Sequence, residues 1–240
     1  MSVLPPLITA PAHPLAISDA EQLVVPASFG EMAGHGRARD AAVSGMLRPA
    51  DIDRATVGRP ERIFLPLWRF DGSADGFHVG VGTITTGRGK TVPIPTGGFR
   101  HHDGQILVPA RALFPIDPCD KLTIASSDML PLAEHPIPER ERVVPDVPRE
   151  DAEEEARARF RRRGEASHAL YSQVDVRIRS GVLVYYPFYV VRYVYAGEAT
   201  SGAEHVYHAA VSARTGKTVS TRHPPIVASV ASKLRRLFDR

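Results

Sequence analysis

Residues 62–99 read RIFLPLWRFDGSADGFHVGVGTITTGRGKTVPIPTGGF, and this stretch decides the fold class. It is rich in β-branched and aromatic residues and punctuated by glycines, a pattern typical of strands joined by tight turns. Residues 174–197 and 204–225 have the same character. With the helices predicted below, we expect an α+β fold of two related antiparallel β-meander units linked by a charged helix.

The likeness between the two β-rich regions suggests an internal repeat. Each has a proline, Pro66 or Pro187, followed by a strand, a glycine turn and a second strand that begins near His78 or His205. Each then ends in Gly-Lys-Thr-Val. We interpret the regions as two β-meanders whose prolines enter edge or bulged strands. A chance likeness between two hairpins is the alternative.

The two Gly-Lys-Thr stretches resemble the end of a phosphate-binding P-loop. A P-loop also needs a glycine five residues earlier and a helix afterwards. Ile84 and Val211 occupy the glycine positions, and prolines follow both stretches. We therefore expect no nucleotide and no other cofactor. Both stretches are better interpreted as hairpin turns, with glycine at positive φ and the lysines, Lys90 and Lys217, exposed.

Two helices are predicted before and between the β regions. Residues 28–47 have a capping-box spacing, with Ser28 as the N-cap and Glu31 three residues later, although three glycines disfavour a helix. A second helix is expected near residues 149–172, where acidic residues precede arginines in the order that suits the helix dipole. Its apolar stripe comprises Ala152, Ala156, Phe160 and Leu170.

The arginines of this second helix are candidate anion contacts. The densest basic run is residues 157–163. Such a run usually forms salt bridges with the preceding glutamates, and phosphate binding is the alternative. The side chains that we select as possible anion contacts are Arg157, Arg161 and Arg162.

Histidine, aspartate and cysteine offer little sign of catalysis or metal binding. His101 and His102 point to opposite faces if they lie on a strand, as do His205 and His208. Cys119 lies between two aspartates, which favour the protonated thiol over a nucleophilic thiolate. With one cysteine in the chain, a zinc ribbon of four cysteines is excluded. We expect no metal and no catalytic residues.

Composition is that of an ordinary globular protein of one or two domains. The chain has 240 residues, 43% of them apolar, and a formal net charge of +3. This charge is too small to argue for nucleic acid unless the basic residues cluster. The N-terminus lacks the features of a signal peptide, and no stretch is apolar enough to span a bilayer.

The C-terminal residues 226–240 are predicted to form a basic amphipathic helix. Apolar residues recur at helical spacing, with lysine and arginine among or opposite them. Such a helix lies on an anionic membrane or docks on a partner, and an ordinary helix covering the core is the alternative. The candidate contacts are Lys233, Leu234, Arg235, Arg236, Leu237 and Phe238.

The order of these segments resembles the bacterial zinc-ribbon proteins labelled primosomal protein N′ (replication factor Y)-like. The residues that carry the likeness are Leu65-Pro66-Leu67-Trp68, DGQILVPA at 103–110, Tyr186-Pro187-Phe188-Tyr189, Arg192-Tyr193-Val194-Tyr195, Thr215-Gly216-Lys217-Thr218-Val219 and Pro224. The likeness covers residues 15–225. The Cys-x-x-Cys ribbons of that family are absent, so its zinc and nucleic-acid roles do not carry over. Relatives often carry membrane helices after this body. The resemblance therefore implies a membrane role for residues 226–240.

These observations predict five segments. They are an extended N-terminal segment (1–26), a first α+β unit (27–130), a Pro-rich connection (131–148), a helix plus second β unit (149–225) and the basic amphipathic helix (226–240).

We expect a non-catalytic binding or scaffold protein, cytoplasmic or peripheral to the inner membrane. It would act at an anionic membrane surface or with protein partners in an assembly, with Trp68, Tyr186 and Tyr189, together with Tyr185, as exposed aromatic contacts. The first alternative is an accessory nucleic-acid-binding protein that uses the basic helix. The second is an enzyme whose site is assembled from scattered residues such as His101, Asp103 and His205.

Overall fold

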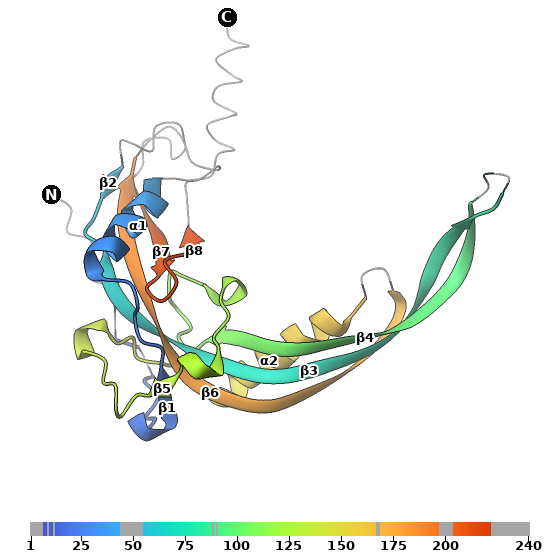
Figure 1. Ribbon diagram of the computed structural model, residues 1–240, viewed down its shortest axis with the longest axis horizontal. Helices are drawn as coiled ribbons and strands as arrows, with labels where there is room; N and C mark the ends of the chain where they lie inside the picture. Colours follow the sequence, from blue (N-terminus) through green and yellow to red (C-terminus); the bar gives the residue numbers. More distant parts are fainter. Residues whose placement is uncertain are drawn as a thin grey trace, which may run out of the picture. The chain divides into compact units, whose positions relative to one another are not determined.

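A computed structural model describes residues 7–8, 10–11, 13–43, 55–87, 89, 91–166, 169–196 and 204–221 (Figure 1). Within these residues the fold is α+β, as predicted, with two α-helices and an open, mixed sheet of eight strands. The order along the sheet is β4–β3–β6–β1–β5. Strands β2 and β7 also pair with β6, and β8 pairs with β7.

The strands are β1 (Gln22–Val24), β2 (Thr56–Val57), β3 (Glu61–Thr85), β4 (Thr91–Pro109), β5 (Leu130–Pro131), β6 (Ala169–Tyr195), β7 (His205–Ser212) and β8 (Thr218–Thr221). The α-helices are α1 (Glu31–Val43) and α2 (Arg149–Gly164). Short 3-10 helices cover Asp19–Glu21, Cys119–Lys121, Ser126–Asp128 and Glu139–Glu141. None of the helices in the described ranges is long and apolar enough to cross a membrane.

The chain divides by its packing into two compact units. The first unit comprises Met1–Pro66, Arg111–Asp146 and Val184–Arg240, and the second comprises Leu67–Ala110 and Val147–Leu183. Strands β3 and β6 each contribute residues to both units. The segment boundaries expected from the sequence rest on composition, and they stay a prediction.

In the first unit, α1 packs on β7 and β8 next to a cluster of buried tyrosines. Small residues make this close packing possible: Ala38 and Ala42 are buried, and the Gly34 backbone lies directly against the Tyr189 ring. The helix begins at Glu31, so the predicted N-cap at Ser28 is wrong. The Ser28 hydroxyl instead accepts a hydrogen bond from Arg214, at 2.5 Å.

In the second unit, α2 packs on the β4–β3–β6 sheet and contacts mainly β4 (Figure 1). The predicted stripe is confirmed over Ala152, Ala156 and Phe160, which are buried together with Gly164 at every fourth position. Leu170 is the exception, because the helix ends at Gly164 and Leu170 lies exposed on β6.

Glycines in β3 serve the packing of α2 and do not form a turn. The glycine turn expected between Pro66 and His78 is wrong, since β3 runs through both residues without interruption. A Cβ atom at Gly72 would lie 2.5 Å from the Arg177 carbonyl oxygen and 3.2 Å from the Phe160 ring. A Cβ atom at Gly76 would meet the Gly164 carbonyl oxygen. Both positions therefore need glycine.

The two Gly-Lys-Thr stretches do form hairpin turns, as predicted. Gly89 has φ +72° and Gly216 has φ +70°, and in the described part of the chain these are the glycines in the left-handed region. Gly89 closes the turn between β3 and β4, and Gly216 closes the turn between β7 and β8. Lys217 is exposed, as expected, whereas Lys90 lies outside the described residues.

Candidate functional site

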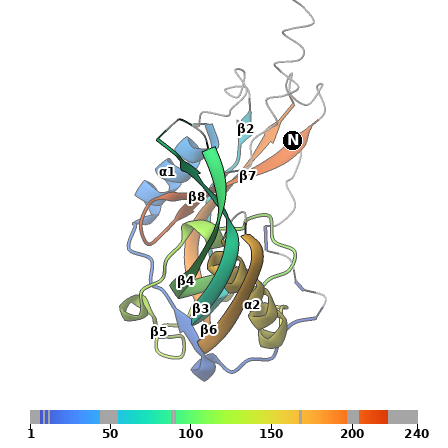
Figure 2. The same ribbon diagram turned by 90° about the vertical axis from the view of Figure 1, so that its right-hand side faces the viewer.

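The second unit carries a hairpin that extends past α2. Residues 77–85 of β3 and 91–99 of β4 form this hairpin, which we call the arm (Figure 1; Figure 2 looks toward it). Its antiparallel register is regular from Phe77 opposite Phe99 to Thr85 opposite Thr91. Valine, isoleucine and threonine favour this extended backbone.

Strand β6 flanks only the root of the arm. Ideal Cβ atoms at Gly72 and Gly76 would lie near Ile178 and Val174, so β3 and β6 run in opposite directions here. Since β6 begins only at Ala169, it lies beside the first few residues of the arm and does not extend to its tip. The remainder is a hairpin, which is marginally stable by itself in water.

Both faces of the arm expose large apolar side chains. Alternation places Phe77, Val81 and Phe99 on one face, where they are 39%, 55% and 87% exposed. The two phenylalanine rings lie with centroids 5.2 Å apart. Ile84 and Val92 oppose each other on the other face, also exposed. Exposed apolar surface grouped in this way typically marks an interaction site.

Prolines close the outer edge of the arm to further strand pairing. Strand β4 lies at the end of the sheet, so one side of its backbone has no neighbouring strand in the described fold. Pro93 and Pro95 lie in its regular ladder with β3. A proline fits such a ladder only where the missing N–H would point outward, so both remove donors from the free edge. Partners are therefore expected to meet side chains rather than this edge.

The arm carries no negative charge. Residues 76–102 contain no aspartate or glutamate. Arg100 follows the arm directly and donates a hydrogen bond from Nη1 to the Glu165 carbonyl oxygen, at 2.8 Å. Glu165 follows the last turn of α2, which contains Arg161, Arg162 and Arg163. The root of the arm and the arginine-rich end of α2 are thus joined through Arg100.

The arginines at the end of α2 affect the protonation of a neighbouring histidine. The pKa of His102 on β4 is lowered, first by burial and then by the nearby charge of Arg163. Arg163 contacts His102 Nε2 at 3.2 Å and donates to the Gln105 carbonyl oxygen at 3.3 Å. The neutral form of His102 is therefore favoured, so positive charge at this end of α2 comes from the arginines.

Two of the three predicted anion contacts on α2, Arg161 and Arg162, face solvent and are not held by a close salt bridge within the described part of the chain. Arg157 is held by Glu153 at 2.6 Å, four residues earlier. Arg162 lies 3.5 Å from Glu155 and is 67% exposed, and Arg161 is exposed without an ion-pair partner in the described residues. The end of α2 can therefore offer two guanidinium groups to an anion.

The predicted aromatic contacts are not on the surface. The expectation that Trp68, Tyr185, Tyr186 and Tyr189 are exposed is wrong, because all four side chains are buried. Trp68 Nε1 donates to the Val147 carbonyl oxygen at 2.8 Å. The Tyr186 and Ser212 hydroxyls lie 2.8 Å apart, and the Tyr189 hydroxyl donates to the Phe29 carbonyl oxygen at 3.0 Å. Burial raises the pKa of each of these tyrosines.

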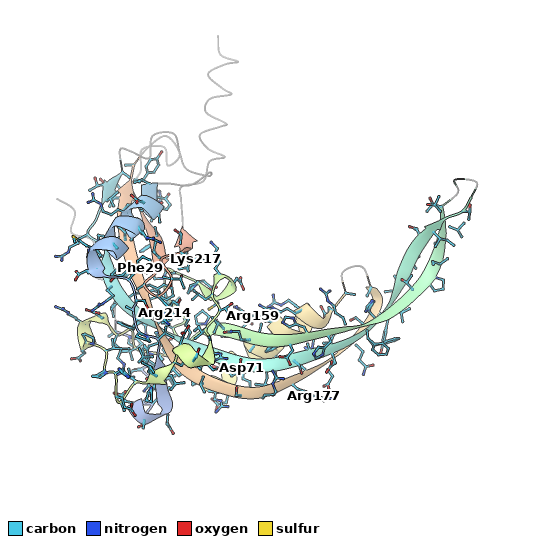
Figure 3. All side chains as sticks on the ribbon, in the orientation of Figure 1. Phe29, Asp71, Arg159, Arg177, Arg214 and Lys217 are labelled. Atoms are coloured by element: carbon cyan, nitrogen blue, oxygen red, sulfur yellow. The ribbon has the colours of Figure 1, made fainter. Side chains whose placement is uncertain are left out.

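The sheet face opposite α2 is covered by paired charges. His101 Nδ1 lies 2.6 Å from Asp75, and Asp103 accepts two hydrogen bonds from Arg179. Figure 3 shows Arg177 on this face and Arg159 on the side of α2. In the described residues, no three His, Cys, Asp or Glu side chains are grouped to hold a metal ion. His101 and Asp103 thus serve as cross-strand partners.

The remaining histidine and cysteine candidates lie in the first unit. His205 and His208 lie on β7, and their register opposite Tyr195 and Arg192 places them on opposite faces, as expected for a strand. Cys119 is buried and forms no disulfide, and its backbone N–H donates to Asp117.

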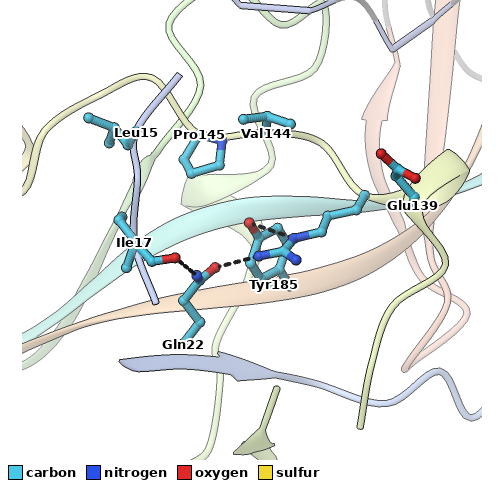
Figure 4. A pocket seen from close by; sticks show the side chains of 8 residues that line it. Leu15, Ile17, Gln22, Glu139, Val144, Pro145 and Tyr185 are labelled. Carbon is cyan, nitrogen blue, oxygen red and sulfur yellow. Dashed lines mark hydrogen bonds between the residues drawn. The ribbon is translucent and has the colours of Figure 1, made fainter. Parts of the chain in front are cut away.

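A pocket of about 200 Å³ lies in the first unit around Arg142 (Figure 4). Arg142 donates to the Tyr185 hydroxyl at 3.2 Å, to Asp19 at 2.7 Å and to Gln22 at 3.0 Å. Its guanidinium also lies 5.0 Å from the centroid of the Tyr185 ring. Because these partners occupy most of its donors, Arg142 offers little to a ligand.

The two look-alike turns differ in their surroundings. Gly216 lies under the Phe29 ring and its carbonyl oxygen accepts a hydrogen bond from Arg37, at 3.0 Å. Arg214 of the same turn binds Asp128 at 2.7 Å. Figure 3 labels Phe29, Arg214 and Lys217 around this turn. Leaving aside its two neighbours in the chain, no described residue lies within 4 Å of a Cβ built on Gly89. The first-unit turn is held in place, whereas the surroundings of Gly89 are open.

The predicted terminal contacts, Lys233, Leu234, Arg235, Arg236, Leu237 and Phe238, lie outside the described residues, as does the whole predicted helix at 226–240.

No protein-family model, curated protein or solved structure matches this chain. Sequence reasoning missed the arm as a candidate surface, although one signal was present. The stretch without acidic residues, 76–102, coincides with the most β-branched part of the chain.

Proposed function

We propose that this chain is a non-catalytic binding or scaffold protein that uses the arm to contact a membrane surface or a multiprotein assembly. The observation that carries the proposal is the exposure of Phe77, Val81 and Phe99 on a hairpin without negative charge. An isolated apolar side chain on a surface is common, but a grouped set on a protruding element is not.

The chemistry of the other candidate sites supports a binding role over catalysis. His101 and Asp103 are engaged in cross-strand pairs, and Arg142 in the pocket is engaged by Asp19, Gln22 and Tyr185. A catalytic base or nucleophile would need a free, polarised side chain facing a cleft. The apolar side chains of the arm cannot act as a base or nucleophile, but they can bind another apolar surface.

A second candidate function is accessory binding of nucleic acid through the end of α2. The exposed guanidinium groups of Arg161 and Arg162, next to Arg100, favour it. Binding through phosphate contacts would weaken steeply as salt is raised. Failure of the purified chain to bind heparin or duplex DNA at low salt would remove this candidate.

Fractionation of an extract from the cell that naturally makes the chain tests the proposed function. We expect wild-type protein in the membrane pellet or in assemblies larger than the monomer. The variant Phe77→Ser/Phe99→Ser should move to the free, monomer-sized fraction. Phe77 and Phe99 are exposed, so the variant should fold, which its thermal unfolding would verify.

Leu113→Ser provides the matched control. Leu113 is 88% exposed and apolar, like Phe99, but lies in the first unit. It should distribute as wild type does. Equal distributions of wild type and the double phenylalanine variant would contradict the arm as the contact element.

Three sequence-based expectations remain parts of this proposal. They are the kinship with the primosomal protein N′-like family, the duplication of two β units, and a location in the cytoplasm or on the inner membrane. The terminal residues 226–240 are proposed as a second contact that acts with the arm.

A further inference from the structure

We infer that the arm docks on an anionic lipid surface, with its apolar side chains in the interface and the arginines at the end of α2 near lipid phosphates. This inference rests on the proposed function, because it names the class of partner that the arm contacts. Four observations carry it.

The first observation is that both faces of the arm are apolar. Phe77, Val81 and Phe99 lie on one face, and Ile84 and Val92 on the other. A groove on a protein partner would usually cover one face and leave the other in water. Lipid surrounds an inserted hairpin on both sides, so it can cover both sets of side chains.

The second observation is the absence of acidic residues from residues 76–102. An aspartate or glutamate on the arm would have to lose its hydration on entering the interface, and anionic lipids would repel it. Asp75 and Asp103 mark the limits of this stretch; Asp103 is paired with Arg179, and Asp75 lies 2.6 Å from His101 Nδ1.

The third observation is the pair of prolines on the free edge of β4. Within lipid, each backbone N–H without a partner is costly, which is why open sheet edges are avoided there. Pro93 and Pro95 carry no N–H, so the part of the edge that they occupy has fewer donors to satisfy. The same prolines disfavour strand addition by a peptide or a second copy.

The fourth observation is charge complementarity at the root of the arm. Arg161 and Arg162 face solvent on the last turn of α2, and Arg100 joins that turn to the arm. Arginine forks match phosphate groups. Each arginine close to an anionic membrane strengthens binding by about fivefold.

Sedimentation of the full-length chain with large vesicles tests the inference. Vesicles of phosphatidylglycerol and phosphatidylcholine are compared with vesicles of phosphatidylcholine alone. We expect wild type to bind the anionic vesicles, and Phe77→Ser/Phe99→Ser to bind them at least about tenfold more weakly. Leu113→Ser, with the same kind of exposed side chain in the first unit, should bind as wild type does.

The arginines are tested separately. Arg161→Gln/Arg162→Gln should lose about 25-fold in affinity for anionic vesicles at low salt. Arg59→Gln/Arg140→Gln is the control, because Arg59 and Arg140 are 85% and 86% exposed and both lie in the first unit. This control should bind anionic vesicles as wild type does. If it loses as much affinity as the Arg161/Arg162 variant, the effect comes from net charge and not from the position of the arginines.

A tryptophan reporter separates insertion from surface attachment. The single tryptophan, Trp68, is buried and hydrogen-bonded, so its emission should not respond to vesicles. Val81→Trp places a second indole on the exposed face of the arm. Its emission should shift to the blue with anionic vesicles, and an unchanged spectrum on bound protein would overturn insertion.

The outcomes distinguish this inference from the proposed function. No vesicle binding at low salt, or equal binding by wild type and the phenylalanine variant, overturns the lipid partner. If the lipid partner is overturned but the phenylalanine variant still moves to the monomer-sized fraction of the cell extract, the proposed function stands with a protein as the partner. Binding of duplex DNA with a steep salt dependence, and no vesicle binding, would replace lipid with nucleic acid.

Discussion

Arg179 on β6 and Asp103 on β4 form a two-point ion pair that crosses the strand between them, with nitrogen–oxygen distances of 2.7 and 2.8 Å. On that middle strand, β3, the residue opposite Asp103 is Ser73, whose short side chain leaves room for the guanidinium. The pair therefore ties the two flanking strands of the second unit together.

Loss of this pair should lower stability in a pH-dependent way. Arg179 lowers the pKa of Asp103, so the folded state prefers the carboxylate more than the unfolded chain does. The stabilisation is present above the ordinary carboxyl pKa of about 4 and is lost as pH falls through the lowered pKa. We expect Asp103→Asn to melt below wild type at pH 7, and the gap to narrow below about pH 4.

Thermal unfolding across this pH range measures the effect. Glu134→Gln is the control, since Glu134 is exposed and lies in the first unit. The gap should also shrink with added salt, because the pair is exposed. A gap that stays constant down to pH 2 would show that the Asp103 charge is not the cause.

Close packing of α2 makes Gly76 intolerant of a side chain. Gly76→Ala would drive a Cβ atom into the Gly164 carbonyl oxygen, so we expect a loss of about 1–3 kcal/mol in the free energy of unfolding. Gly36→Ala is the matched control, because no described residue outside the adjacent turns of α1 lies within 4 Å of its Cβ position. It should stabilise by about 0.5–1 kcal/mol, since alanine favours a helix. Urea unfolding measures both, and equal effects would contradict the packing argument.

The two positive-φ turns should respond differently to alanine. Gly89→Ala meets open space and carries only the left-handed backbone strain, about 1–2 kcal/mol. Gly216→Ala carries the same strain and also meets the Phe29 ring, at 2.6 Å, so a further cost of about 1–3 kcal/mol is expected. Denaturant unfolding should rank Gly216→Ala as the less stable variant. The reverse order would mean that the first-unit turn is loosely packed.

The predicted terminal helix is tested by Leu234→Glu/Leu237→Glu in the full chain. If residues 226–240 bind a membrane, the variant should bind anionic vesicles at least about tenfold more weakly with unchanged thermal unfolding. If the helix covers the core, the melting temperature should fall instead. A variant that matches wild type in both measurements would contradict both roles.

Local patterns predicted the elements whose cause is local. The order of acidic residues before arginines predicted α2, and the spacing of Ala152, Ala156 and Phe160 predicted its buried face. The failure of Ile84 and Val211 as P-loop glycines predicted hairpin turns. In both cases the signal depends on neighbours within a few residues.

Errors arose where distant segments decide the outcome. The glycines at 72 and 76 look like turn residues, but α2 approaches from far along the chain and requires them to lack a side chain. The tyrosines of β6 look exposed because strand periodicity does not reveal which faces are covered. Tyr189 is covered by α1, whose Gly34 lies against its ring, and Tyr185 packs with Val24, Phe64 and Leu132, so both side chains are buried. The arm was missed for the same reason, because only the fold shows that its large apolar side chains are exposed.

The prolines of β4 have one more consequence, for the behaviour of the protein in concentrated solution. Bare hairpins rich in valine and isoleucine are seeds for stacking into fibrils, in which each chain adds its edge to the last. Pro93 and Pro95 interrupt that edge in every copy. We therefore expect the edge of the arm to resist fibril growth even though its apolar side chains are exposed.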